Sequence, residues 1–310
     1  MSIATSTTET QLTPKLSQRW QFGVGQLLCC AWFACFFIYA SYVPLFHTDI
    51  WGHVLYGHWI LDHQALPTQD PFLPLAEGMP VVDTAWLAQV IFGAVDRWAG
   101  PEGISILFAL TTLATQLLMF RTFLLQTGRL GQAMACLAVM GLLGGTRHAI
   151  VRPEVFGVLC FATLWWLIVR SDRASRSKSA PSEAGSSAAL WLGVPLLFML
   201  WANLHGSFMI GLIVLGCYAA GRAVEVAGRT WSLRAVFADR EFRRWLLFTE
   251  LATVSSLVNP LRPEAADLHI AIFAEPQPAR RARMASAPAC LPRRHHGLGG
   301  RAAGPGGRPP

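Results

Sequence analysis

The sequence predicts an all-α fold, a polytopic transmembrane helical bundle of about seven spans. Composition is the first reason, because 53% of the residues are hydrophobic and only 14% are charged, whereas a typical soluble domain has about 25% charged residues. The second reason is that several separate apolar runs approach or exceed the roughly 20 residues that cross the hydrocarbon core of a bilayer. These observations exclude a soluble domain with a single anchor and make the lipid bilayer a partner of the chain.

The first apolar run, Phe22 to Phe46, follows a Ser- and Thr-rich segment, residues 1–21, that we expect to be disordered and cytoplasmic. The run is longer than the roughly 7–15 residues of a signal-peptide core, so it predicts a retained first helix. Further spans are predicted at about 101–124, 130–145, 153–170, 188–204, 207–227 and 244–260. The bundle with its first outer loop, residues 47–100, therefore occupies residues 22–274.

The first outer loop is rich in polar and ionisable residues. Asp49 to His63 has an uneven apolar face and predicts a helix that lies along the membrane surface. Leu66 to Pro80 contains four prolines and cannot continue this helix. Thr84 to Trp98 predicts a second interfacial helix, with Asp83 or Thr84 as its N-cap. We therefore expect two surface helices within the loop.

Lys and Arg residues are unevenly distributed among the short loops, and this asymmetry predicts the orientation. With a cytoplasmic N-terminus, most of the arginines fall in the cytoplasmic connections. The histidines and several polar residues then gather at the outer face, and ionisable groups at membrane depth are usually functional or paired. The residues that we select from this outer group as candidates for the site are Asp49, His53, Asp83, Arg147, His148, Arg152, Glu154, Asn203 and His205.

The formal net charge of +7 does not indicate a nucleic-acid partner, because residues 275–310 hold seven arginines and one glutamate and so supply most of it. This basic tail consists mainly of Ala, Arg, Gly and Pro, and we expect it to be disordered. Such a composition also arises when GC-rich DNA is read out of frame. Two explanations stay open, a frameshift product that ends a longer membrane protein early or a genuine basic tail.

Several motifs together resemble the GT-C superfamily of glycosyltransferases and related bacterial polytopic proteins. The resemblance covers about residues 22–262, and its motifs are Asp49-x-Trp51-x-His53, GHWILDH at 57–63, LPTQDPF at 66–72, VDTAWLAQ at 82–89, Arg152-Pro153-Glu154-x-Phe156, WANLHG at 201–206 and Asn259-Pro260.

The resemblance implies a multi-pass protein of the bacterial cytoplasmic membrane that transfers a sugar from a polyprenyl-phosphate donor outside the cytoplasm. In that superfamily, an acidic residue just after the first helix serves as catalytic base or metal ligand, and Asp49 matches this position. Asp83 is the candidate for the second acidic group. Relatives often place an acid directly before the Trp of the second surface helix, where this chain has Ala85.

Sugar transfer from a lipid phosphate needs a base for the acceptor hydroxyl and cations for the leaving phosphate. Asp49 is the candidate base, and Arg147, His148 and Arg152 are the candidate cations. Structural explanations remain open for two of them: Asp49 can be the N-cap of the first surface helix, and Arg152 can form a local ion pair with Glu154. His205 and Asn203, at the outer end of a span, are candidates for substrate binding.

His53, His58 and His63 recur every five residues, which turns their side chains to different faces of a helix and argues against a shared metal site. Asp49 and His53, one turn apart, are the one pair there with ligand-like spacing. A divalent metal therefore stays open as a cofactor, and no residues are assigned to it. Competing functions are a non-catalytic membrane or lipid-binding protein and, less favoured, a transporter. The oligomeric state is not predicted.

Overall fold

The computed structural model describes residues 23–45, 49–72, 85–145, 150–176 and 184–260, with side chains left out for 174–189. Within these ranges the regular structure is helical, and no strand occurs in them. The predicted disordered N-terminus and basic tail lie outside the described residues, as do Asp83, Arg147 and His148. The all-α prediction is confirmed for the described part of the chain.

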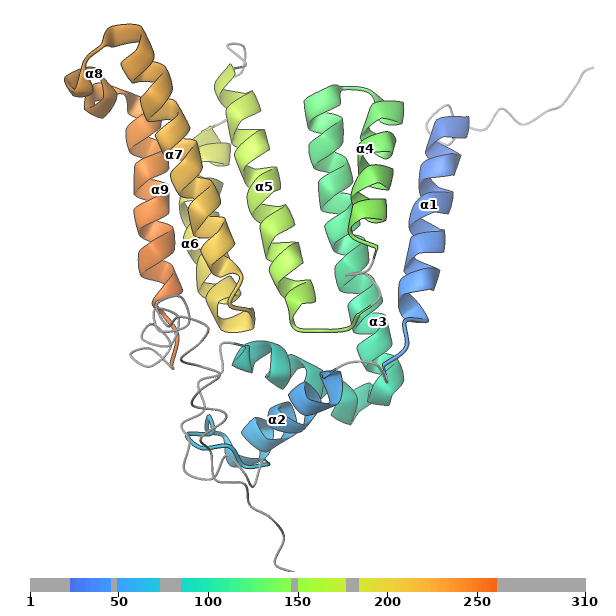
Figure 1. Cartoon of the computed structure of the whole chain (residues 1–310). Coiled ribbons are helices and arrows are strands. Elements are labelled where there is room, and N and C mark those ends of the chain that lie inside the picture. The colour runs from blue at the N-terminus through green and yellow to red at the C-terminus, as the bar shows by residue number, and fades with distance from the viewer. Residues whose placement is uncertain (1–22, 46–48, 73–84, 146–149, 177–183, 261–310) are drawn as a thin grey trace, which may run out of the picture. The chain divides into compact units, whose positions relative to one another are not determined.

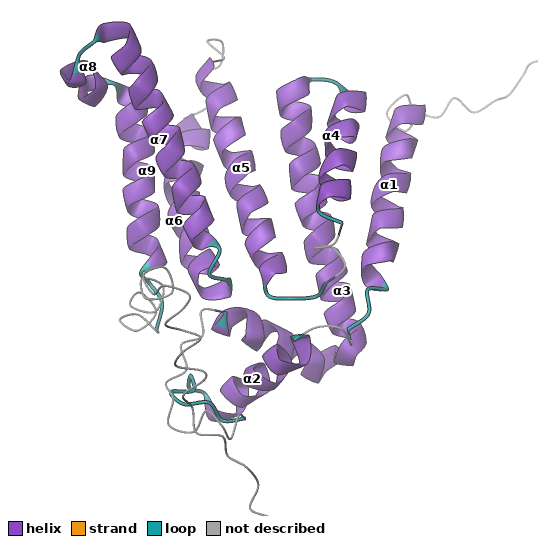
Figure 2. Cartoon of the chain, in the orientation of Figure 1, coloured by secondary structure: helices purple, strands orange, loops and turns teal. Residues whose placement is uncertain are grey.

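The helices of the bundle run side by side (Figures 1 and 2). They are α1 (Val24–Ser41), α3 (Trp86–Thr127), α4 (Leu130–Leu143), α5 (Glu154–Arg176), α6 (Ala184–Leu204), α7 (Phe208–Thr230) and α9 (Arg240–Ser256). α3 packs against α1, α4 and α5, and α9 packs against α6 and α7. Four helices, α1, α3, α5 and α7, are long and apolar enough to cross a membrane, and α4 and residues 190–204 of α6 are shorter apolar helices.

Two of the differences from the sequence prediction arise at helix caps, which hydropathy alone does not detect. A short helix, α8 (Leu233–Ala238), precedes α9, and Ser232 caps it by accepting a hydrogen bond from the Ala235 N–H. α9 begins at Arg240, four residues before the predicted start, because the Asp239 carboxylate accepts a hydrogen bond from the Phe242 N–H. Both caps satisfy N–H groups that would otherwise lack a partner at a helix start.

α3 is bent at Gly100, whose φ of 63° and ψ of −163° interrupt the helical backbone. Glycine adopts this conformation without the steric cost that a Cβ brings, and Pro101 fits the first turn of the helix that follows. The bend separates residues 86–99 from residues 101–127, close to the predicted boundary between the second surface helix and the next span. The first segment begins at Trp86 with Ala85 at its N-cap position, in place of the predicted Asp83 or Thr84.

α2 (Ile50–His63) packs closely on residues 86–99 of α3 at one end of the bundle (Figure 1). The two helices cross at Gly57 and Gly93, where a Cβ built on Gly57 would lie 2.0 Å from the Gln89 carbonyl oxygen. Beside the crossing, Arg97 donates a 2.6 Å hydrogen bond to the Asp62 carboxylate, and His58 Nε2 lies 3.2 Å from Asp96 Oδ2. The two helices predicted for this loop thus pack on one another, and we name this side of the molecule the α2 end.

Candidate functional site

Several segments of the chain meet at the α2 end, because successive helices bring their ends back to it (Figure 1). α2 begins there, the segment before α5 passes beside it, and α6 ends there. Six of the predicted site residues are described, and all lie on these segments: Asp49, His53, Arg152, Glu154, Asn203 and His205.

Asp49 and Arg152 form an ion pair at this end. Arg152 Nε donates to Asp49 Oδ1 at 2.9 Å, and both side chains are about half exposed. Asp49 occupies the N-cap position of α2, yet its carboxylate makes no capping hydrogen bond. Asp49 thus has the N-cap position that the sequence analysis left open, but its carboxylate faces Arg152 and does not bond to the helix start.

His53 lies one turn further along α2, with its Nε2 3.9 Å from Asp49 Oδ2 and its Nδ1 3.2 Å from Gln89 Nε2. Gln89 is only 2% exposed, so this contact holds the imidazole between α2 and α3. His58 instead faces Asp96, and His63 stacks on the Trp59 ring. The three histidines thus contact different partners, as their five-residue spacing predicts.

Asn203 fastens three parts of the chain together. Its Oδ1 accepts a 2.8 Å hydrogen bond from Trp86 Nε1, and its Nδ2 donates to the carbonyl oxygens of Met199 and Val258. The side chain is buried and both of its amide hydrogens are used inside the protein. Asn203 therefore positions α3 against α6, a role that the sequence analysis did not assign.

His205 is held in the turn between α6 and α7. Its Nδ1 accepts a hydrogen bond from the Ser207 N–H, and the Ser207 hydroxyl accepts one from Trp201 Nε1. Burial lowers the pKa of His205, the nearby Glu154 carboxylate opposes this effect, and His53 adds to it. The neutral ring with an accepting Nδ1 carries its proton on Nε2, which makes Nε2–H a hydrogen-bond donor at neutral pH.

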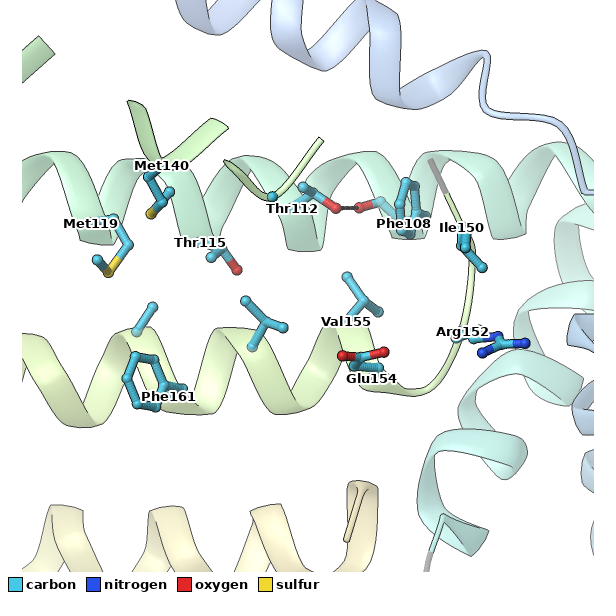
Figure 3. Close-up of a pocket in the computed structure, with 13 residues that line it drawn as sticks. Phe108, Thr112, Thr115, Met119, Met140, Ile150, Arg152, Glu154, Val155 and Phe161 are labelled. Atoms are coloured by element: carbon cyan, nitrogen blue, oxygen red, sulfur yellow. Dashed lines mark hydrogen bonds between the residues drawn. The ribbon is translucent and has the colours of Figure 1, made fainter. Parts of the chain in front are cut away.

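A cavity of about 290 Å³ opens beside this cluster, between α3, α4 and α5. Figure 3 shows α3 and α5 side chains facing one another across it, with Arg152 and Glu154 at one end. Most of the lining is apolar, and the lining residues are Phe108, Thr112, Thr115, Met119, Met140, Gly144, Ile150, Arg152, Glu154, Val155, Val158, Phe161 and Ala162. Arg152 therefore belongs both to the ion pair and to the cavity lining, so the site has charged groups at one end and a mainly apolar lining elsewhere.

Two site residues, Gln89 and Trp86, were not selected from the sequence. Both belong to the VDTAWLAQ motif, and they are three residues apart on α3, a spacing that puts them on the same helix face. This shared face was the feature of the sequence from which both residues could have been selected. Among the residues that the structure describes, no group of three or more His, Cys, Asp or Glu side chains is arranged to hold a metal ion.

Comparisons with family models, with characterised proteins and with solved structures gave no match. The fold and the site themselves define a class, a helical membrane protein with an ion-paired polar cluster at one end and an apolar cavity beside it.

Proposed function

We propose that this chain is a membrane glycosyltransferase that transfers a hexosyl or pentosyl group from a polyprenyl-phosphate donor to an acceptor at the extracytoplasmic face of the bacterial cytoplasmic membrane. The observation that carries the proposal is the Asp49–Arg152 ion pair, whose arginine also lines the apolar cavity. A candidate base and a candidate phosphate-binding cation are thereby next to a space for an apolar chain.

The donor of the proposal is an amphiphile, and the two parts of the site match its two parts. The cavity between α3, α4 and α5 offers apolar side chains to the isoprenoid chain. Arg152 offers a guanidinium group with five N–H donors, of which Nε–H is bonded to Asp49. A guanidinium group can donate two parallel hydrogen bonds to two oxygens of one phosphate. The headgroup would therefore lie at Arg152, with its sugar near Asp49.

In the proposed reaction, Asp49 takes the proton of the acceptor hydroxyl while the acceptor oxygen forms a bond to the anomeric carbon of the sugar. The bond between that carbon and the phosphate oxygen breaks, and its electron pair leaves with the lipid phosphate. Arg152 stabilises the added negative charge on the phosphate. His205 Nε2–H, near Glu154 and His53, is a donor for a sugar hydroxyl. Asp83 remains the second acidic group of the proposal.

The proposed topology has seven spans, formed by α1, residues 101–127 of α3, α4, α5, α6, α7 and α9. The end of the bundle opposite α2 carries arginines on α3, α5, α7 and α9, whereas fewer are described at the α2 end. By the positive-inside rule, this asymmetry supports an orientation with the α2 end outside the cytoplasm. α2 and residues 86–99 of α3 would lie along the outer membrane surface as the two interfacial helices.

Sugar transfer in membranes that contain the full chain tests this function, with a radiolabelled polyprenyl-phosphate sugar as donor. Asp49→Asn should lower the rate at least about 100-fold, since general-base catalysis contributes about 10²–10⁴. The matched control is Asp62→Asn, because Asp62 also lies at α2 and also pairs with an arginine, Arg97. We expect the control to keep its rate within about threefold.

Equal rates for the wild-type chain and Asp49→Asn would remove Asp49 from the mechanism. Donor binding without sugar transfer by the wild-type chain would instead support the second candidate, a non-catalytic lipid-binding protein. The observation that favours this second candidate is the apolar cavity, which can accept a lipid chain without any reaction at the polar cluster.

A further inference from the structure

A second hollow, of about 420 Å³, lies between α3 and α5 at the end of the bundle opposite α2. Its lining combines three arginines with apolar side chains and contains no carboxylate; the lining residues are Arg121, Leu124, Leu125, Gly128, Trp166, Arg170 and Arg173. We name it the arginine hollow. It is distant from the polar end of the proposed active site, because Arg170 lies 16 residues beyond Glu154 on α5, which is about 24 Å along the helix.

The three guanidinium groups of the arginine hollow have no ion-pair partner among the residues that the structure describes. Two other arginines at the same end have carboxylate partners: Arg222 pairs with Asp239 and Glu225, and Arg244 pairs with Glu241. Asp172 follows Arg170 closely in sequence but lines a different hollow with Arg222 and Glu225. The arginine hollow is therefore a local excess of positive charge.

Two of these arginines are held in place by the protein. The Arg170 guanidinium lies over the Trp166 ring, 5.2 Å from its centroid, and Arg173 donates a hydrogen bond to the Leu125 carbonyl oxygen. Holding a side chain in advance reduces the entropy that a ligand must overcome on binding. A ligand that enters the hollow thus meets arranged positive charges beside leucine and tryptophan side chains.

We propose that the arginine hollow binds the headgroup of an anionic phospholipid from the adjoining bilayer leaflet. A phosphodiester accepts hydrogen bonds from guanidinium groups, and Leu124, Leu125 and Trp166 provide contact for the first part of the acyl chains. Basic pockets between transmembrane helices bind such headgroups. The lipid links the ends of α3 and α5, which are also two walls of the apolar cavity.

Native mass spectrometry of the full chain, released from mixed micelles with defined lipids, tests the proposal. We expect phosphatidylglycerol to stay bound, whereas phosphatidylcholine, a phosphodiester without net charge, should not. Inorganic phosphate alone should not bind and should not compete with phosphatidylglycerol. Equal retention of the two lipids, or binding of phosphate alone, would overturn the proposal, and this comparison needs no variant.

A pair of double variants then tests the location. Arg121→Gln with Arg170→Gln should weaken retention of phosphatidylglycerol about 10-fold or more, because each arginine near an anionic lipid contributes of the order of 1 kcal/mol. The matched control is Arg240→Gln with Arg243→Gln, two exposed arginines at the same end that do not line the hollow. The control should retain the lipid like the wild type. Equal loss in both double variants would assign the effect to overall charge and overturn the site.

Discussion

Arg152 and Asp49 are 103 residues apart in the chain, yet Arg152 Nε donates to Asp49 Oδ1 at 2.9 Å. The bond joins the start of α2 to the segment that leads into α5. It also links the polar cluster to the cavity, since Arg152 is part of the cavity lining. The proposed function depends on this relationship, because it puts a carboxylate and a guanidinium where a lipid phosphate would enter.

The Asp49–Arg152 pair should contribute little to stability. Both side chains are about half exposed, at 53% and 43%, and exposed ion pairs typically contribute about 0–1 kcal/mol. A double-mutant cycle with Asp49→Asn and Arg152→Gln, read by denaturant unfolding in detergent, should give a coupling energy in that range. A coupling energy above about 3 kcal/mol would instead indicate a buried structural pair, and would weaken the catalytic assignment.

The crossing of α2 and α3 should not tolerate a side chain at Gly57. A Cβ there would lie 2.0 Å from the Gln89 carbonyl oxygen, so the two helices must move apart. Gly57→Ala should lower the free energy of unfolding by about 1–3 kcal/mol or more. Gly52→Ala is the matched control, because it lies on the same helix with open space around it. The control should be neutral or stabilising by up to about 1 kcal/mol. Equal changes in the free energy of unfolding for Gly57→Ala and Gly52→Ala would refute the close crossing.

The contribution of the Trp86–Asn203 hydrogen bond to the free energy of unfolding can be measured with the variant Trp86→Phe. The change removes the indole N–H and leaves the buried Asn203 Oδ1 without this donor. We expect a loss of about 1–3 kcal/mol in the free energy of unfolding. Trp98→Phe on the same helix serves as control, since Trp98 is 88% exposed. The prediction fails if the two variants unfold alike.

The lowered pKa of His205 should make stability depend on pH. As pH falls through about 6.5, the ordinary value of histidine, the unfolded chain binds a proton at His205 while the folded chain does not yet do so. Stability therefore falls as pH falls below about 6.5. Melting temperatures between about pH 7.5 and 5 should decline less steeply for His205→Gln than for the wild type. The exposed His63, changed to Gln, is the control, and identical slopes for wild type and His205→Gln would contradict the prediction.

Filling the apolar cavity should block the lipid chain without disturbing the polar cluster. Val158→Phe adds a ring to the cavity lining on α5. We expect at least about 10-fold weaker binding of a fluorescent long-chain polyprenyl phosphate and little change for a short-chain analogue, since each buried CH₂ contributes about 0.8 kcal/mol. Val139→Phe on α4 is the control, because Val139 is exposed and does not line the cavity. Unchanged long-chain binding by Val158→Phe would mean that the chain lies elsewhere.

The sequence predicted features that depend on neighbouring residues. Apolar runs located most of the helices and predicted a boundary between Trp98 and residue 101, close to the bend at Gly100 in α3, because hydropathy acts over one or two turns. The short α8 was missed, since Ser232 and Asp239 cap helices within a stretch of mixed polarity. The alternation of helix direction also placed Asp49, Arg152 and His205 at one end.

Only the tertiary structure decided which of these residues meet. It paired Asp49 with Arg152, His53 with Gln89, and Trp86 with Asn203, and it opened the cavity beside them. Residues separated by about 35 to 120 positions come together according to how the helices pack and rotate about their axes. A helical period shows which face of one helix is apolar, but the partner of a polar side chain on that helix depends on the neighbour that covers it.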